Sequence, residues 1–244
     1  MRVLRELRRK HVDHVVDLLP GCPKIREVTY GEFQPYFVHT ILEEVHLDSA
    51  STVVDLGSGI GNLVIQAAIQ IGCDAYGVEL RPELHIIAEE LHLAARLQCA
   101  HLAVPMGRVV LENADMLLSP RVAEWVARAD LLVANNKVLG VHVINRHIID
   151  RLICNMKHGA VVIATDPFIA TSQTRSGNRY TTPVEGTQLY WCADDARLEV
   201  VKRSYPKDSV SWASAPGDYY VHRMYKVNEV QSKQEVMQRA YEVS

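Results

Sequence analysis

Three closely spaced glycines and one carboxylate form a pattern that could hold a charged cofactor. Gly57, Gly59 and Gly61 follow a short apolar run, and Asp55 stands near the end of that run. Glycines at this point of an α/β fold let a ligand approach the backbone closely. A carboxylate beside them would pair with an ammonium group and would repel a pyrophosphate. The pattern therefore favours S-adenosylmethionine, which carries an amino-acid moiety, over a dinucleotide.

Two further acids stand where the nucleoside of such a cofactor would lie. Glu79 comes 20 positions after Gly59, at the end of the next predicted strand, where an acid accepts hydrogen bonds from ribose hydroxyls. Asp115 follows the third predicted strand and is placed to accept from the adenine amino group. A tight strand-to-helix turn would explain the glycines alone, but it would not explain three acids at successive strand ends. The chemistry predicted is methyl transfer, with S-adenosylhomocysteine as the product.

The elements that must position these residues alternate between short apolar runs and helical patterns. Because the runs are apolar on both faces, they predict a mostly parallel, doubly wound sheet. The predicted strands of this part are 52–56, 75–78, 108–112, 131–135 and 160–165, and the helices between them are 61–71, 82–98, 120–127 and 141–156. Later runs at 188–192, 198–203 and 219–227 predict antiparallel strands. The fold class predicted is α/β, a Rossmann-like, seven-stranded class I methyltransferase fold with an antiparallel C-terminal edge, preceded by a small helical N-terminal segment.

Charge and composition exclude several other classes. The 244 residues carry a formal net charge of -3, so binding to nucleic acid through phosphates alone is not expected. The five cysteines are widely spaced and form no C-x-x-C pair, which favours a reduced protein without a zinc site. We expect no metal site. No apolar run approaches the roughly 20 residues that a membrane helix needs, so no membrane contact is expected.

Several separated segments match one family pattern together. They are residues 29–32 with Tyr-Gly-Glu, 54–62 with the glycine loop, 76–79, the paired asparagines 135–136, 209–212 with Val-Ser-Trp, and 218–222. The glycine loop is shared by many methyltransferases, whereas Tyr-Gly-Glu and Val-Ser-Trp are much more specific. Together they resemble the disruptor-of-telomeric-silencing family of histone lysine methyltransferases that lack a SET domain. The resemblance implies methylation of a lysine on the globular surface of histone H3 within nucleosomes, in the nucleus, by a compact monomer.

The resemblance also implies roles for single residues. Asn135 would lie near the transferred methyl group, and Trp212 and Tyr219 would form the aromatic walls of a narrow channel for the lysine. Such a channel would lower the pKa of the lysine ammonium by desolvation, so no separate base is required. The donor contacts implied are Tyr30 and Glu32 in a covering loop, Asp55, Gly57, Ser58, Gly59, Gly61, Asn62 and Asn135 around the methionine part, Glu79 at the ribose, and Asp115 and Met116 at the adenine.

The predicted elements and the family resemblance together divide the chain into three parts. Residues 1–48 are predicted as an N-terminal helical segment that includes the loop over the donor, residues 49–228 as the catalytic domain, and residues 229–244 as a C-terminal tail. Basic residues near the start are expected to contact nucleosomal DNA or an acidic nucleosome surface. These residues are Arg2, Arg5, Arg8, Arg9 and Lys10.

Some positions depart from the family pattern and keep alternatives open. Lys137 and Leu139 stand where aromatic residues typically follow the paired asparagines, and Met116 stands where an aromatic residue commonly follows the adenine-contacting acid. Phe33 replaces a small polar residue after Tyr-Gly-Glu. One alternative is a class I methyltransferase with another acceptor, such as RNA, another protein or a small molecule. Another is an inactive scaffold that binds the donor.

Overall fold

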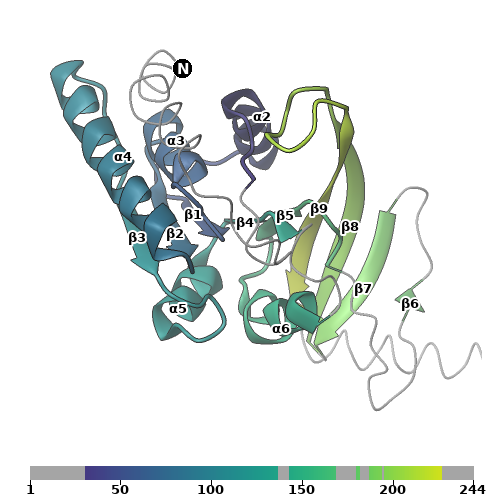
Figure 1. Ribbon diagram of the computed structural model, residues 1–244. Helices are drawn as coiled ribbons and strands as arrows, with labels where there is room; N and C mark the ends of the chain where they lie inside the picture. The colour runs from purple at the N-terminus through teal and green to yellow at the C-terminus, as the bar shows by residue number, and fades with distance from the viewer. Residues whose placement is uncertain (1–30, 137–142, 169–179, 182–186, 194, 227–244) are drawn as a thin grey trace, which may run out of the picture.

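One mixed sheet forms the centre of the molecule (Figure 1). The computed structural model describes residues 31–136, 143–168, 180–181, 187–193 and 195–226. In these residues the sheet has nine strands in the order β3-β2-β1-β4-β5-β9-β8-β7-β6. The parallel strands are β1 (Thr52–Leu56), β2 (Asp74–Glu79), β3 (Val109–Asn113), β4 (Leu131–Ala134) and β5 (Val161–Ala164). The antiparallel strands are β6 (Tyr180–Thr181), β7 (Thr187–Ala193), β8 (Ala196–Tyr205) and β9 (Gly217–Lys226).

The predicted α/β class with a mostly parallel sheet and an antiparallel C-terminal edge is confirmed, but the predicted number of seven strands is wrong. The predicted strands 188–192, 198–203 and 219–227 correspond to β7, β8 and β9, whereas the two residues of β6, which pair with β7, were not predicted as a strand. Strand β7 pairs with backbone groups of β8 that would otherwise form an open edge.

Helices cover both faces of the sheet (Figure 1). Helices α2 (Pro35–Val45) and α3 (Asn62–Gln70) pack on one face with Val53 and Val133, and α5 (Pro120–Arg128) and α6 (Val143–Arg151) pack on the other face with Val54. Successive residues of a strand point to opposite faces, which explains why both Val53 and Val54 are buried. Helix α4 (Pro82–His101) packs on α3, and a short 3₁₀ helix, η5 (Ile153–Asn155), follows α6. None of the helices in the described residues is long and apolar enough to cross a membrane.

The order of the parallel strands determines where a ligand can bind. Strand β1 lies between β2 and β4, so the chain leaves β1 toward one side and returns on the other. This reversal is the topological switch point of the sheet, and α/β proteins bind ligands beyond the carboxyl ends of the strands there. The candidate site is therefore expected at the ends of β1, β2 and β4.

Candidate active site

The loop after β1 turns into α3 through three glycines in the left-handed region. The φ angles are 77° at Gly57, 54° at Gly59 and 74° at Gly61, which a residue with a Cβ rarely adopts. The N–H groups of Gly57 and Ser58 both donate to the Val78 carbonyl at 2.9 Å. The loop is thus fixed to the end of β2, with its glycine backbone exposed to the switch point.

Gly77 on β2 makes room for this loop, although it was not predicted as a site residue. A Cβ at Gly77 would lie 2.8 Å from Ser58 Oγ and 3.0 Å from Leu111 Cδ2. Any side chain would therefore push the glycine loop away from β2. The available signal was a glycine inside an apolar strand, which often marks close approach of another backbone.

Two acids lie on the strand ends next to the loop. Glu79 accepts from the Gly59 N–H at 2.8 Å through Oε2 and from the Arg81 N–H at 2.9 Å through Oε1. Asp55 is buried, and burial together with the negative charge of Glu79 raises the pKa of Asp55 to about 7. A buried carboxylate with a raised pKa would gain from a cationic partner, because that partner offsets the cost of the charge.

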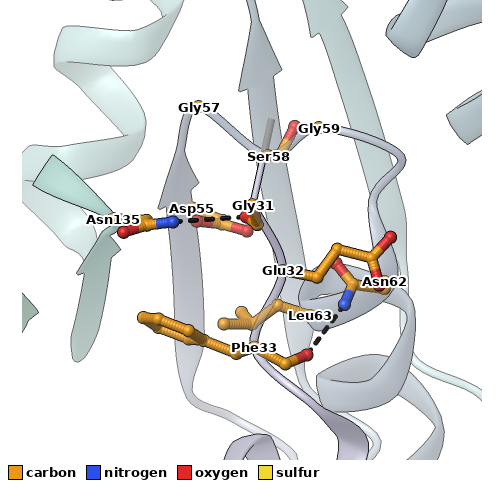
Figure 2. Close-up of a pocket in the computed structure, with 10 residues that line it drawn as sticks. All are labelled: Gly31, Glu32, Phe33, Asp55, Gly57, Ser58, Gly59, Asn62, Leu63 and Asn135. Atoms are coloured by element: carbon orange, nitrogen blue, oxygen red, sulfur yellow. Dashed lines mark hydrogen bonds between the residues drawn. The ribbon is translucent and has the colours of Figure 1, made fainter. Parts of the chain in front are cut away.

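A cleft opens between this loop and the segment before α2 (Figure 2). The space between atoms in this cleft is about 340 Å³, a volume that includes its opening to solvent. A Cβ on Gly57 would meet no atom within 4 Å, so the space also extends over this glycine. The residues that line the cleft are Gly31, Glu32, Phe33, Asp55, Gly57, Ser58, Gly59, Asn62, Leu63 and Asn135.

Residues 31–34, which we call the strap, form one wall of the cleft through Gly31, Glu32 and Phe33. Side-chain amides hold the strap by its carbonyl groups: Asn135 Nδ2 donates to Gly31 O at 3.2 Å, and Asn62 Nδ2 donates to Phe33 O at 3.1 Å (Figure 2). Asn135 follows β4, and Asn62 begins α3. The strap is therefore held on both sides by residues that themselves line the cleft.

The strap also pairs with a segment that follows it by 179 positions. The Glu32 N–H donates to Ser211 Oγ at 2.8 Å, and the Ser211 N–H donates to Glu32 O at 2.9 Å. The Gln34 N–H donates to Ser209 O at 2.9 Å. Glu32 of the Tyr-Gly-Glu segment and Ser211 of the Val-Ser-Trp segment, which carry the more specific part of the resemblance, thus meet at one edge of the cleft.

Comparison with known proteins agrees with this geometry. Residues 22–224 match the family model described as "Histone methylation protein DOT1". The chain belongs to the DOT1 family. This result confirms the predicted resemblance to non-SET histone methyltransferases.

Two curated DOT1 relatives carry the name "Histone-lysine N-methyltransferase, H3 lysine-79 specific". The protein from Emericella nidulans is 28% identical over 220 residues, which cover 90% of this chain and 41% of the relative. The protein from Aspergillus fumigatus is 30% identical over 221 residues, which cover 90% of this chain and 41% of the relative. The chain thus spans about two fifths of the length of these relatives. A solved RNA methyltransferase from Salinibacter ruber, in complex with S-adenosyl-L-homocysteine, is 17% identical with a TM-score of 0.48, covering 81% of this chain and 94% of that chain.

Among the aromatic residues that the DOT1 resemblance assigns to a lysine channel, Trp212 lies beside the cleft. A Cβ on Gly31 would lie 2.6 Å from Trp212 Cε3, so the indole packs directly on the strap. Its ring centroid is 5.9 Å from that of Phe33. Trp212 Nε1 is buried and has no hydrogen-bond partner among the described residues. A buried indole N–H usually has an acceptor, which for Trp212 is not among the described residues.

Tyr219, the second predicted channel residue, is not among the cleft-lining residues. It lies on β9 with its ring edge-on to Phe37 at 5.2 Å, and its hydroxyl donates to Glu44 Oε2 at 2.8 Å. Burial, and then this hydrogen bond, raise the pKa of Tyr219 well above its usual range. Arg203 Nε is 3.2 Å from Glu44 Oε1 on the other side. The channel role of Tyr219 stays a prediction.

Asp115 and Met116, the two predicted adenine contacts, are not among the residues that line the cleft. Asp115 is exposed, and its Oδ1 accepts from the Leu117 N–H at 2.8 Å, which stabilises the turn before α5. Met116 is half-buried and packs against the core under α5. Gly61, another predicted donor contact, is the N-cap residue of α3 and is not among the cleft-lining residues. No group of three or more His, Cys, Asp or Glu residues that could hold a metal ion occurs within the described ranges.

Some predictions fall on residues that the structure does not describe. Tyr30, Lys137 and Leu139 lie outside the described residues, as do the basic residues between positions 2 and 10. The contributions expected of these residues to the donor site, the channel and nucleosome contact stay predictions.

Proposed function

We propose that this chain is an S-adenosylmethionine-dependent protein-lysine N-methyltransferase that acts on histone H3 in nucleosomes. The observation that carries the proposal is the pairing of the strap with residues 209–211 at the edge of the glycine-loop cleft. The names of the two relatives support lysine 79 of histone H3 as the target. A nuclear location follows from this substrate.

The residues of the cleft fit the methionine end of the donor. The buried Asp55 carboxylate would gain an ammonium partner, and the N-terminus of α3 offers backbone N–H groups to the donor carboxylate. Glu79 uses one lone pair of each carboxylate oxygen on a backbone N–H, so each oxygen keeps a further lone pair for the ribose hydroxyls. S-adenosylmethionine, when bound, supplies an electrophilic methyl group on its sulfonium.

The acceptor would approach beside Asn135 and Trp212. Asn135 lines the cleft, and Trp212 covers Gly31 at the end of the strap. An apolar approach disfavours the charged lysine ammonium and so lowers its pKa, which produces the neutral amine that attacks. Aromatic faces attract methylammonium by roughly 0.5–2 kcal/mol, which favours retention of a partly methylated lysine. Tyr219 is proposed as a second wall of this channel.

Contact with the nucleosome is proposed to come from the basic residues near the start of the chain. Neutralising phosphates with Lys and Arg gives affinity that falls steeply with salt. The protein is proposed to act as a monomer. Binding to nucleosomes should therefore weaken at higher salt, and removal of residues 1–10 should reduce this salt dependence.

The experiment that tests the function uses labelled donor with whole nucleosomes, free histones and RNA in parallel. Asp55→Asn serves as the matched variant that should lose donor binding. We expect label in histone H3 of nucleosomes only, and mass spectrometry of the product reports the lysine and the number of methyl groups. Label in RNA alone would overturn the proposal in favour of another acceptor. Donor binding without transfer to any acceptor would instead support an inactive scaffold.

A further inference from the structure

The two consecutive asparagines after β4 have different partners. Asn135 lines the cleft and donates through Nδ2 to Gly31 O. Asn136 is fully buried and bonds both backbone groups of Asp166, donating to the carbonyl at 3.0 Å and accepting from the N–H at 2.8 Å. Asn136 therefore connects the end of β4 to the segment after β5 by hydrogen bonds, whereas Asn135 forms its hydrogen bond with the strap.

Thr165 lies between the two asparagines. It follows β5 directly, its side chain is 3% exposed, and its hydroxyl is 3.1 Å from Asn135 Oδ1 and 3.3 Å from Asn136 Oδ1. A hydroxyl has only one proton to donate. Because Asn136 Oδ1 already accepts from the Asp166 N–H, the nearer Asn135 Oδ1 is the better acceptor for that proton.

An amide that is held at both ends keeps one orientation. The Gly31 carbonyl requires the nitrogen end of Asn135, and the Thr165 hydroxyl donates to the oxygen end. Figure 2 shows the nitrogen of Asn135 directed toward Gly31 and its oxygen on the opposite side. We propose that Thr165 is a positioning residue, whose hydroxyl fixes the Asn135 amide so that it holds the strap against the donor cleft. This inference rests on the donor-binding function proposed above.

Thr165→Val is the direct perturbation, because valine keeps the shape of threonine and removes the hydroxyl. The half-buried Asn135 side chain would lose the donor to its oxygen, and an acceptor that is partly shielded from water is costly to leave without a donor. The amide would turn toward another donor, release Gly31 and loosen the strap. Loss of about one hydrogen bond from the closed cleft predicts donor affinity about five- to tenfold weaker.

The test measures the affinity of the full chain for S-adenosylhomocysteine by calorimetry. Thr165→Ser restores the hydroxyl and should bind within about twofold of the wild-type protein. Thr40→Val is the matched control, since Thr40 is exposed on α2 and its hydroxyl bonds only to the carbonyl of Tyr36 one turn earlier among the described contacts. The control should also bind like the wild-type protein. Equal affinity of Thr165→Val and the wild-type protein, or equal weakening by Thr165→Ser and Thr165→Val, would overturn the inference.

A double-mutant cycle with Asn135→Ala separates positioning from general damage to the fold. If Thr165 acts through Asn135, Thr165→Val should weaken binding in the wild-type background and cause no further loss in the Asn135→Ala background. Additive losses would overturn the inference even if the single variant is poorly stable. Failure of the wild-type protein to bind S-adenosylhomocysteine would overturn the proposed function itself, and the inference with it.

Discussion

Asp55 should destabilise the protein when no donor is bound, and this cost should depend on pH. Burial and the charge of Glu79 raise the pKa of Asp55 from 3.8 to about 7. Between these two values the folded protein binds more protons than the unfolded chain, so Asp55 lowers the stability progressively as the pH rises through this window. A shift of about 3 units at 1.36 kcal/mol per unit gives an upper limit of about 4 kcal/mol above pH 7.

Asp55→Asn tests this expectation, because the amide resembles the protonated carboxyl group and carries no charge. The variant should already be more stable by about 1–2 kcal/mol near pH 5, because the unfolded carboxyl group is ionised above its ordinary pKa of 3.8, and the difference should vanish only as the pH falls below about 4. At pH 8 the variant should be more stable by about 2–4 kcal/mol, which corresponds to a melting temperature roughly 5–10 °C higher for a chain of this size. Urea or thermal unfolding at pH 5, 6, 7 and 8 measures the difference.

The same variant should fail at donor binding, since the donor ammonium loses its carboxylate. Affinity for S-adenosylhomocysteine should fall at least about tenfold at pH 8 by calorimetry. Asp150→Asn, on the exposed side of α6, controls for the loss of one negative charge from the protein. Equal or lower stability of Asp55→Asn at pH 8, or undiminished donor affinity, would refute the reasoning.

Three further outcomes are expected. Glu79→Ala removes the acceptor of the Gly59 N–H and should weaken donor binding at least about tenfold, and near-normal affinity by calorimetry would contradict the ribose role. His222 is buried and neutral, accepting from the Phe168 N–H, and burial lowers its pKa to about 4 from 6.5. The unfolded chain binds more protons in that window, so stability should fall by about 3 kcal/mol as the pH drops from 6.5 to 4, and urea unfolding of His222→Gln should show a smaller loss. Gly31→Ala places a Cβ 2.6 Å from the Trp212 ring, so it should weaken donor binding, and additional replacement of Trp212 by Leu should restore part of the affinity.

Local patterns were sufficient to predict the glycine loop and the strands other than β6. The predicted strand 52–56 is observed with the same bounds, and the predicted strand 131–135 ends one residue earlier, at Ala134. This early end places Asn135 in the cleft instead of in the sheet. Strand period and glycine spacing are properties of neighbouring residues, so a single sequence reports them directly.

Strand order predicts that the three acids lie at strand ends on one edge of the sheet, but it does not predict where each side chain points. Asp55 and Glu79 lie at adjacent strand ends and share one electrostatic environment, as expected for neighbouring parallel strands. Asp115 also follows its strand, but its carboxylate accepts from the Leu117 N–H and lies in solvent. The direction of a side chain after a strand depends on the local turn, which strand order alone does not determine.

Contacts between distant segments could not be derived from spacing. The hydrogen bonds between Glu32 and Ser211 join residues 179 positions apart, and neither residue type requires the other. The roles of Asn62 and Thr165 also depend on contacts between separated segments. Asn62 donates to Phe33 of the strap, and Thr165 donates to Asn135, which holds the strap. The family resemblance identified both segments as parts of one pattern, but it did not indicate that they pair. The structure shows the pairing.

Under the proposed function, the pairing of the strap with residues 209–211 makes donor binding and acceptor binding depend on one backbone segment. Asn62, at the start of the helix that follows the glycine loop, holds Phe33 of the strap, and Trp212 packs on Gly31 two residues earlier. A change in the donor cleft that moves the strap must therefore also move the surface on which Trp212 rests. Variants that loosen the strap should accordingly affect donor affinity and lysine transfer together, whereas a variant confined to Trp212 should affect transfer more than donor affinity.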